Sequence, residues 1–121
     1  MKISVEWLEE QDACEDYVAL FQQTFGNEVE LTRDALLKAA ATGQQVGWLA
    51  RKVLPPAQLA EYKRDEATAM VEYKRVTATA LAKYKRVTAP GRRAKYKRVK
   101  APAWAEFKRV AATALADILG L

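Results

Sequence analysis

The chain has 121 residues, of which half are hydrophobic and 29% are charged, with only five glycines and four prolines. This composition excludes a disordered chain, and the length suits one domain, or a small domain with an appendage, that buries a core without metal or disulfide support. The net charge of +5 is unevenly spread: residues 1–56 carry five Lys or Arg against nine Asp or Glu, and residues 57–121 carry fifteen against six. The sequence therefore predicts an acidic head, residues 1–56, and a basic region, residues 57–121.

The residue types argue against catalysis. Cys14 is the single cysteine and histidine is absent, so the chain can form neither an internal disulfide nor a Cys/His metal cluster, and it lacks the usual acid–base group of neutral pH. No glycine-rich phosphate loop occurs. We expect no enzyme activity, no cofactor and no metal. Because the start has no apolar signal run and no stretch approaches ~18 apolar residues, we expect a cytoplasmic protein that neither spans nor binds a membrane.

The head begins with two predicted helices. Ser4 is a candidate N-cap for a short turn that carries Trp7 and Leu8. From Asp12 to Gly26, apolar residues follow the helical spacing i, i+3, i+4, i+7 and i+11, and Gly26 suits the C-terminal cap. Because Cys14 belongs to this apolar set, we expect a buried packing thiol rather than a reactive one. The acidic cluster beside it is interpreted as a solvated first helical turn, or as a site for a cation or a basic partner: Glu9, Glu10, Asp12, Glu15, Asp16.

Two further helices complete the predicted head. Thr32 is a good N-cap for a helix that should stop at Gly43. A last helix is expected over residues 45–54, where Pro55 and Pro56 end it. Residues 27–31 form the single segment that alternates in the manner of a strand. Short helices with one apolar face each predict a small bundle.

The head and the repeats after it resemble a group of small uncharacterised bacterial and phage proteins. The motifs that carry the resemblance are "ISVEWLEEQDAC", "TFG", "GWLARKVLP" and tandem "EYKRV" units. In that group an "EWL…AC…F…FG…WLA" head precedes repeats of the type "EYERV.APALA". The resemblance spans most of the chain and implies a helical head and a phage or mobile-element origin. It implies no activity and no site residues, and lysine often replaces the acid of those repeats here.

An 11-residue repeat dominates the basic region. Its aromatic residues recur at spacings of 11, 11, 12 and 11: Tyr62, Tyr73, Tyr84, Tyr96, Phe107. Eleven residues at ~100° each make about three helical turns, so each column of the repeat forms a nearly straight stripe. The aromatic column and the apolar columns beside it, with Leu81 and Trp104 among their members, are predicted to form the core face. The opposite side is predicted to carry an alanine strip between the cations: Ala78, Ala82, Ala101, Ala105, Ala112, Ala116.

The 12-residue unit contains a turn signal, Thr88-Ala89-Pro90-Gly91. We expect a corner near residues 89–91 that joins helices of about 56–88 and 92–119 into a hairpin. A rod kinked at Pro90 and Pro102, or three shorter helices, are the alternatives. The predicted fold class is all-α: a small N-terminal helical bundle followed by a long 11-residue-repeat helical hairpin.

The cations of the repeat are the candidate binding residues: Lys63, Arg64, Lys74, Arg75, Lys85, Arg86, Lys97, Arg98, Lys108, Arg109. Such a stripe suits an acidic protein surface, including the acidic head of another copy, or nucleic-acid phosphates. No helix-turn-helix, RRM or zinc module is present, and aromatics on a core face are poor stacking platforms. A solvated face kept by repeat duplication explains the same pattern.

These observations lead to a hypothesis of non-catalytic binding. We expect an accessory or inhibitor-like protein of a phage or mobile element that docks on an acidic macromolecular surface. The alternatives are a nucleic-acid-binding protein that uses the Lys-Arg stripe on phosphates, and a structural helical-repeat or oligomerisation module that self-associates.

Overall fold

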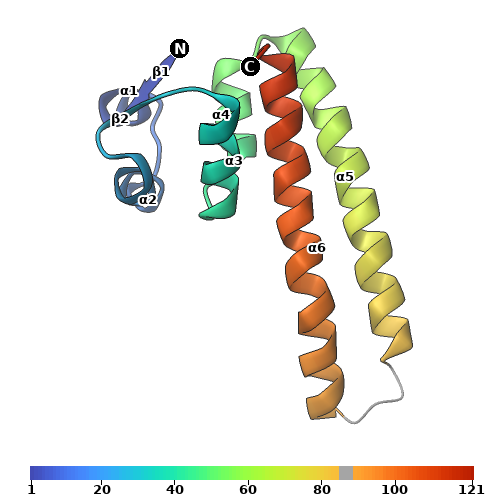
Figure 1. The fold of residues 1–121 in the computed structure, drawn as a ribbon. Coiled ribbons are helices and arrows are strands. Elements are labelled where there is room, and N and C mark those ends of the chain that lie inside the picture. Colours follow the sequence, from blue (N-terminus) through green and yellow to red (C-terminus); the bar gives the residue numbers. More distant parts are fainter. Residues whose placement is uncertain (85–88) are drawn as a thin grey trace.

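The computed structural model describes residues 1–84 and 89–121 and is mostly helical, 78%. Its elements in chain order are β1 (Lys2–Ser4), α1 (Val5–Glu10), α2 (Glu15–Phe25), β2 (Glu28–Glu30), α3 (Arg33–Ala41), α4 (Val46–Val53), α5 (Pro56–Lys83) and α6 (Ala89–Ile118). Figure 1 shows three parts side by side: the small sheet with α1 and α2, then α3 and α4, then the long helices α5 and α6. The all-α expectation is confirmed, with a two-stranded sheet as the exception.

The sheet pairs the two ends of the first third of the chain. β1 and β2 are antiparallel, with Lys2 opposite Glu30 and Ile3 opposite Val29. Ile3 is buried while its neighbours face outward, as the alternation of a strand requires. β2 lies within the segment where the sequence shows alternation, whereas β1 is too short and too close to the helix N-cap at Ser4 for a pattern to identify it.

The caps predicted from sequence are present. The Ser4 hydroxyl oxygen accepts a hydrogen bond from the Trp7 N–H at 3.1 Å, and the Thr32 hydroxyl oxygen accepts one from the Ala35 N–H at 3.1 Å. Each satisfies a backbone donor that the first helical turn leaves unpaired. Gly43, after α3, has φ +95°, a conformation that glycine adopts without a steric cost.

The expectation that Cys14 is a buried packing thiol is wrong. It is exposed and is the N-cap residue of α2, with an extended backbone. The chain turns at Asp12, whose φ is +59°, so the helix starts after Cys14 although the apolar spacing already includes that residue. A side chain outside the helix does not share the direction that the helical period assigns to it.

The helices α5 and α6 lie side by side and run in opposite directions (Figure 1). Residues 89–91, where the corner was expected, form the first turn of α6 instead, a position at which a helix tolerates proline. The intervening residues 85–88 lie outside the described residues. α6 continues through Pro102 as one helix, so the alternative of three shorter helices is wrong.

One core joins the head to the near ends of the long helices. It contains head residues such as Leu8, Leu36 and Leu49, and it also contains Tyr62 of α5 and Leu115 of α6. Residues on both sides of Pro56 therefore share one apolar interior. The near ends of the helix pair are covered by a third layer, whereas their far ends are not (Figure 1).

A close contact between α4 and α5 fixes this junction. The Tyr62 hydroxyl, on a side chain that is only 2% exposed, donates a hydrogen bond to the Glu66 carboxylate at 2.8 Å. A Cβ added at Gly47 of α4 would lie 3.1 Å from that carboxylate, so the absence of a side chain lets the helices approach. On the other side, Arg33 at the start of α3 donates to the Asp117 carboxylate at 2.5 Å and to the Leu121 carbonyl at 2.7 Å.

The third layer changes which repeat residues are buried. Ala112 and Ala116 were expected on the solvent side, but both are fully buried where α6 packs on α3, because alanine allows helices to pack closely. Leu81 and Trp104 were expected in the core, but they are 52% and 41% exposed. Leu115, at the same repeat position, is fully buried. The apolar stripe of each helix is wider than the face that the other helix covers. The head covers the rest of the stripe, but only at the near end of the helix pair.

We expect Leu115→Ala to lower the free energy of unfolding by about 2–5 kcal/mol, as loss of a buried leucine does. Leu81→Ala is the matched control and should cost about 0.5 kcal/mol, as surface substitutions do. Urea unfolding monitored by circular dichroism measures both. Equal costs would contradict the three-layer near end.

Candidate binding surface

The repeat cations are placed mainly on the surface. Lys63, Arg64, Lys74, Lys97 and Arg98 are exposed. Lys108 is half-buried beside the head, and Lys85 and Arg86 lie outside the described residues. The stripe predicted from the repeat is therefore accessible along most of its described length.

Two of the arginines are held by acids of their own helix. Arg75 donates two hydrogen bonds to the Glu72 carboxylate, at 2.5 and 3.0 Å. Arg109 holds Glu106 in the same way, at 2.5 and 2.9 Å. Hydrogen bonding to the arginines lowers the pKa of both carboxyls and raises the pKa of both guanidinium groups. These exposed pairs reduce the local positive charge, so Arg75 and Arg109 are weaker candidates for a partner than the other exposed cations.

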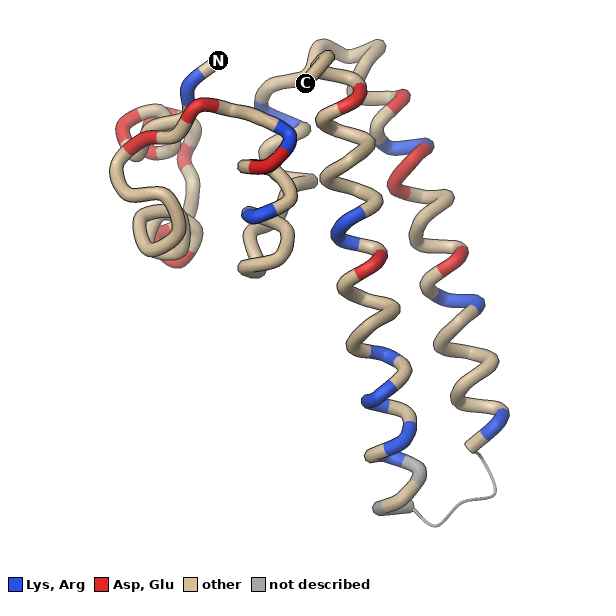
Figure 2. The backbone as a smooth tube through the Cα atoms, in the orientation of Figure 1, with Lys and Arg blue, Asp and Glu red and all other residues tan. Residues whose placement is uncertain are grey.

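Positive charge is densest at the far end of the helix pair. From Tyr73 to Ala105 the sequence contains eleven Lys or Arg and no Asp or Glu. The described residues of this segment, 73–84 and 89–105, form the part of α5 and α6 that extends beyond the head, here called the distal arm. Figure 2 shows basic residues along its two helices and acidic residues confined to the near half and the head.

The distal arm adds cations that repeat columns alone do not identify: Lys83, Arg93, Lys95 and Lys100, all exposed. They occupy variable positions of the repeat, so the conserved Lys-Arg pair of the repeat does not include them. The signal that finds them is the absence of any acid over the whole segment. The candidate surface is therefore one end of the molecule rather than a stripe along its full length.

Lysines of the distal arm lie over the tyrosine rings of the repeat. The Lys83 and Lys95 ammonium groups lie 5.6 and 5.8 Å from the centre of the Tyr84 ring, and that of Lys100 lies 5.9 Å from the Tyr96 ring. These are cation–π distances. The two tyrosine rings thus hold three lysines from variable positions of the repeat, not the lysines that directly follow each repeat tyrosine.

Trp104 is the exposed aromatic at the base of the distal arm. Its ring stacks on Phe107 with centroids 5.0 Å apart and meets Tyr73 edge-on at 5.2 Å. A cleft of about 400 Å³ separates it from the head and is lined on the head side by Gly43 and Trp48. The Trp104 ring is therefore an apolar contact point at a cleft that Arg51 and Lys108 also line.

The head carries the opposite charge. From Ile3 to Thr32 the sequence contains eight Asp or Glu and no Lys or Arg. All eight are exposed, on α1, on α2, at the turn between these helices, and on β2: Glu6, Glu9, Glu10, Asp12, Glu15, Asp16, Glu28, Glu30. Among the described residues, the only salt bridge to this group runs from the Met1 amino terminus to Glu30, at 3.1 Å.

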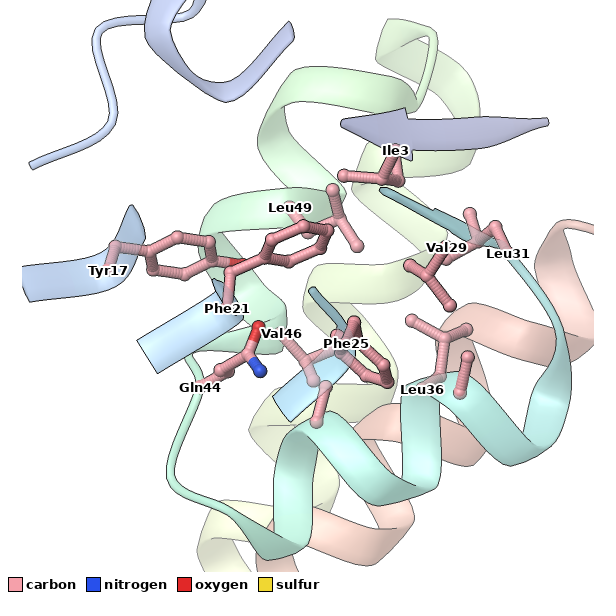
Figure 3. A pocket seen from close by; sticks show the side chains of 12 residues that line it. Ile3, Tyr17, Phe21, Phe25, Val29, Leu31, Leu36, Gln44, Val46 and Leu49 are labelled. Carbon is pink, nitrogen blue, oxygen red and sulfur yellow. The ribbon is translucent and has the colours of Figure 1, made fainter. Parts of the chain in front are cut away.

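A small cavity lies inside the head (Figure 3). It has a volume of about 20 Å³, room for about one water molecule, and apolar side chains such as Phe21, Phe25 and Leu36 surround it. The Gln44 side chain is the polar exception. It is buried, and its amide nitrogen has no hydrogen-bond partner among residues 1–84 and 89–121. The cavity is too small for a substrate, so the distal arm is the stronger candidate site.

No group of His, Cys, Asp or Glu residues within the described parts of the chain has the arrangement of a metal site. None of the described helices is long and apolar enough to cross a membrane. No family model, no curated protein and no solved structure matches the chain. Its function must therefore be inferred from the geometry and charge of the chain itself.

We expect Gln44→Leu to raise the free energy of unfolding by about 1–3 kcal/mol, the cost of leaving a buried donor unpaired. Gln45→Leu, at the adjacent exposed residue, is the control and should change stability little. Thermal and urea unfolding measure both. A destabilised Gln44→Leu protein would show that a bound water or another partner satisfies the amide.

Burial raises the pKa of Tyr17 to about 12, with a smaller contribution from the charge interaction with Cys14. The unfolded chain releases this proton near pH 10.0, so the native state loses stability as the pH rises from 10 towards 12. Tyr17→Phe should reduce that loss while keeping the ring packed on Trp48, 4.8 Å away. The measurement is the urea unfolding midpoint of Tyr17→Phe and of the unmodified protein across this pH range. Equal slopes of midpoint against pH in the two proteins would contradict the prediction.

Proposed function

We propose that the chain is a non-catalytic binding protein that docks the distal arm on an acidic macromolecular surface. The observation that supports this proposal is the density of one charge sign: the sequence has eleven cations and no acid between Tyr73 and Ala105. The described residues of this segment lie on two helices that extend past the head (Figure 2). In this proposal the 11-residue repeat builds a helical hairpin whose cations recur about every 16 Å along each helix.

The cost of this arrangement favours a binding role over a purely solubilising face. Like charges on neighbouring turns and on facing helices repel one another and destabilise the folded state. A solubilising surface avoids that cost by mixing both signs, as the near half does with Glu106 beside Arg109, and as Glu72 does at the boundary, where it holds Arg75 of the distal arm. The distal arm lacks such acids, and an acidic partner would offset its repulsion.

The tyrosine rings favour a protein partner over single-stranded nucleic acid. Tyr84 and Tyr96 lie half-buried under lysines, so their faces are poor platforms for bases. The exposed Trp104 ring, at a cleft with both polar and apolar lining, suits contact with a protein, since aromatic residues supply much of the affinity of protein interfaces.

Binding to nucleic-acid phosphates is the second candidate. It is favoured by the absence of any carboxylate along the distal arm, because no acid there would repel a phosphate backbone. The third candidate is a structural helical-repeat module. An accessory or inhibitor-like role in a phage or mobile element, and a cytoplasmic site of action, belong to the proposal through the sequence resemblance and composition.

We expect the fourfold variant Lys95→Glu, Lys97→Glu, Arg98→Glu and Lys100→Glu to lose binding to a polyglutamate peptide by at least tenfold. The unmodified protein should bind this probe, more weakly as salt shortens the Debye length from ~10 Å at 0.1 M to ~3 Å at 1 M. Titration calorimetry measures both. The control reverses Lys2, Lys52, Lys63 and Arg64, which are exposed outside the distal arm, and so makes the same change in net charge.

The same titrations with duplex and single-stranded DNA separate the candidates. Phosphate binding gives a linear fall of log K with log salt concentration, little sequence preference and tighter binding than polyglutamate. Equal loss of polyglutamate binding in the fourfold variant and in its control would assign the effect to net charge alone and overturn the proposed surface.

A further inference from the structure

We propose that the acidic surface bound by the distal arm is the head of a second copy of this chain, so that two copies form an antiparallel dimer. This inference rests on the proposed function, because it names the partner of the same surface. In the dimer the distal arm of each copy lies against the head of the other copy.

Charge complementarity within one sequence supports the dimer. The head segment from Ile3 to Thr32 carries eight acids and no cation, and the segment from Tyr73 to Ala105 carries eleven cations and no acid. The eight acids are all exposed. The two surfaces have opposite signs, so the head of one copy attracts the distal arm of another. Contacts of head with head, or of arm with arm, set like charges against each other and are disfavoured.

One chain cannot satisfy these opposite charges by itself. The helices α1 and α2 lie on the side of α3 and α4 that faces away from the helix pair, and the distal arm extends away from the head (Figures 1 and 2). The salt bridges of the described residues join Met1 to Glu30, Arg33 to Asp117, Arg75 to Glu72 and Arg109 to Glu106. None joins the acidic segment of the head to the distal arm, so the attraction is left for a second molecule.

The shape of the molecule suits the same arrangement. The head projects sideways from the near end of the helix pair and leaves the side of the distal arm open below it (Figure 1). Two such angular molecules in antiparallel orientation each fill the open side of the other. A twofold axis makes the same contact twice, and the assembly therefore closes at two copies rather than growing as a filament.

Trp104 supplies an apolar component at the inner corner. It is 41% exposed and lines the cleft between the head and the distal arm, with Phe107 and Lys108. In the antiparallel arrangement this corner faces the partner. Exposed charge alone gives strong salt dependence and little affinity, and an indole buried at the contact adds apolar area to it.

The test is charge-swap complementation, read as mass in solution. At low salt we expect the unmodified protein to have twice the 13.5 kDa mass of one chain and to become a monomer at high salt. The arm variant is the fourfold reversal at Lys95, Lys97, Arg98 and Lys100. The head variant carries Glu6→Lys, Glu9→Lys, Glu10→Lys and Asp12→Lys. Each variant alone sets like charges against each other and should remain a monomer.

Mixing the two variants restores both contacts. The native head of the arm variant meets the native arm of the head variant, and the reversed arm meets the reversed head. We expect a one-to-one heterodimer at low salt, by light scattering coupled to size exclusion. Circular dichroism of each variant establishes that it is folded, so a monomer reports lost association rather than lost structure.

Three results would overturn the inference: an unmodified protein that is monomeric at low salt, a mixture that stays monomeric, or assemblies that grow beyond two copies. Failure of the dimer is distinguishable from failure of the proposed function. A monomer that still binds polyglutamate through Lys95, Lys97, Arg98 and Lys100 retains the proposed surface and lacks only the second copy as its partner.

Discussion

The contact between the head and the near ends of α5 and α6 is the constraint on which the rest of the structure depends. It buries Tyr62, Ala112, Leu115 and Ala116 in the same core as the head residues. Three layers of structure exist at this end, and two at the other. The difference decides which apolar residues of the repeat are covered, where cations can accumulate, and which part of the chain is free to meet a partner.

The distribution of acidic and basic residues follows the same division between the near and far ends of the helix pair. In the near half, acids lie among the cations of the helix pair, and Glu106 holds Arg109. In the distal arm the lysines and arginines whose side chains the structure describes are exposed, and three of the lysines lie over tyrosine rings. Long lysine and arginine side chains tolerate this arrangement because their charged ends reach solvent while their stems cover the apolar seam. The cost of repulsion is lowest where side chains can spread, at an end of the molecule.

The proposed binding role and the proposed dimer place the same surface in two different contexts. A distal arm that binds the head of a second copy would have to release it to bind another acidic surface. Competition of this kind would make the free concentration of the protein, and the salt concentration, determinants of how much arm is available. The two proposals therefore constrain each other through one set of residues.

The sequence by itself determined the local structure. The caps at Ser4 and Thr32, the end of α4 before Pro55 and Pro56, and the helical 11-residue repeat all depend on interactions within a few residues of the chain. The opposite charges of the two regions were equally visible in composition. These features need no knowledge of what packs against each segment.

Only the tertiary structure decided which side of each repeat is covered. Leu81 and Leu115 occupy the same repeat position, and one is 52% exposed while the other is fully buried. Periodicity gives a residue its angle around the helix, but burial depends on a third layer whose extent is set by the length of the head. The same limit applies to Cys14, whose exposure was decided by where the helix starts, and to the distal arm, which exists because the head ends before the helices do.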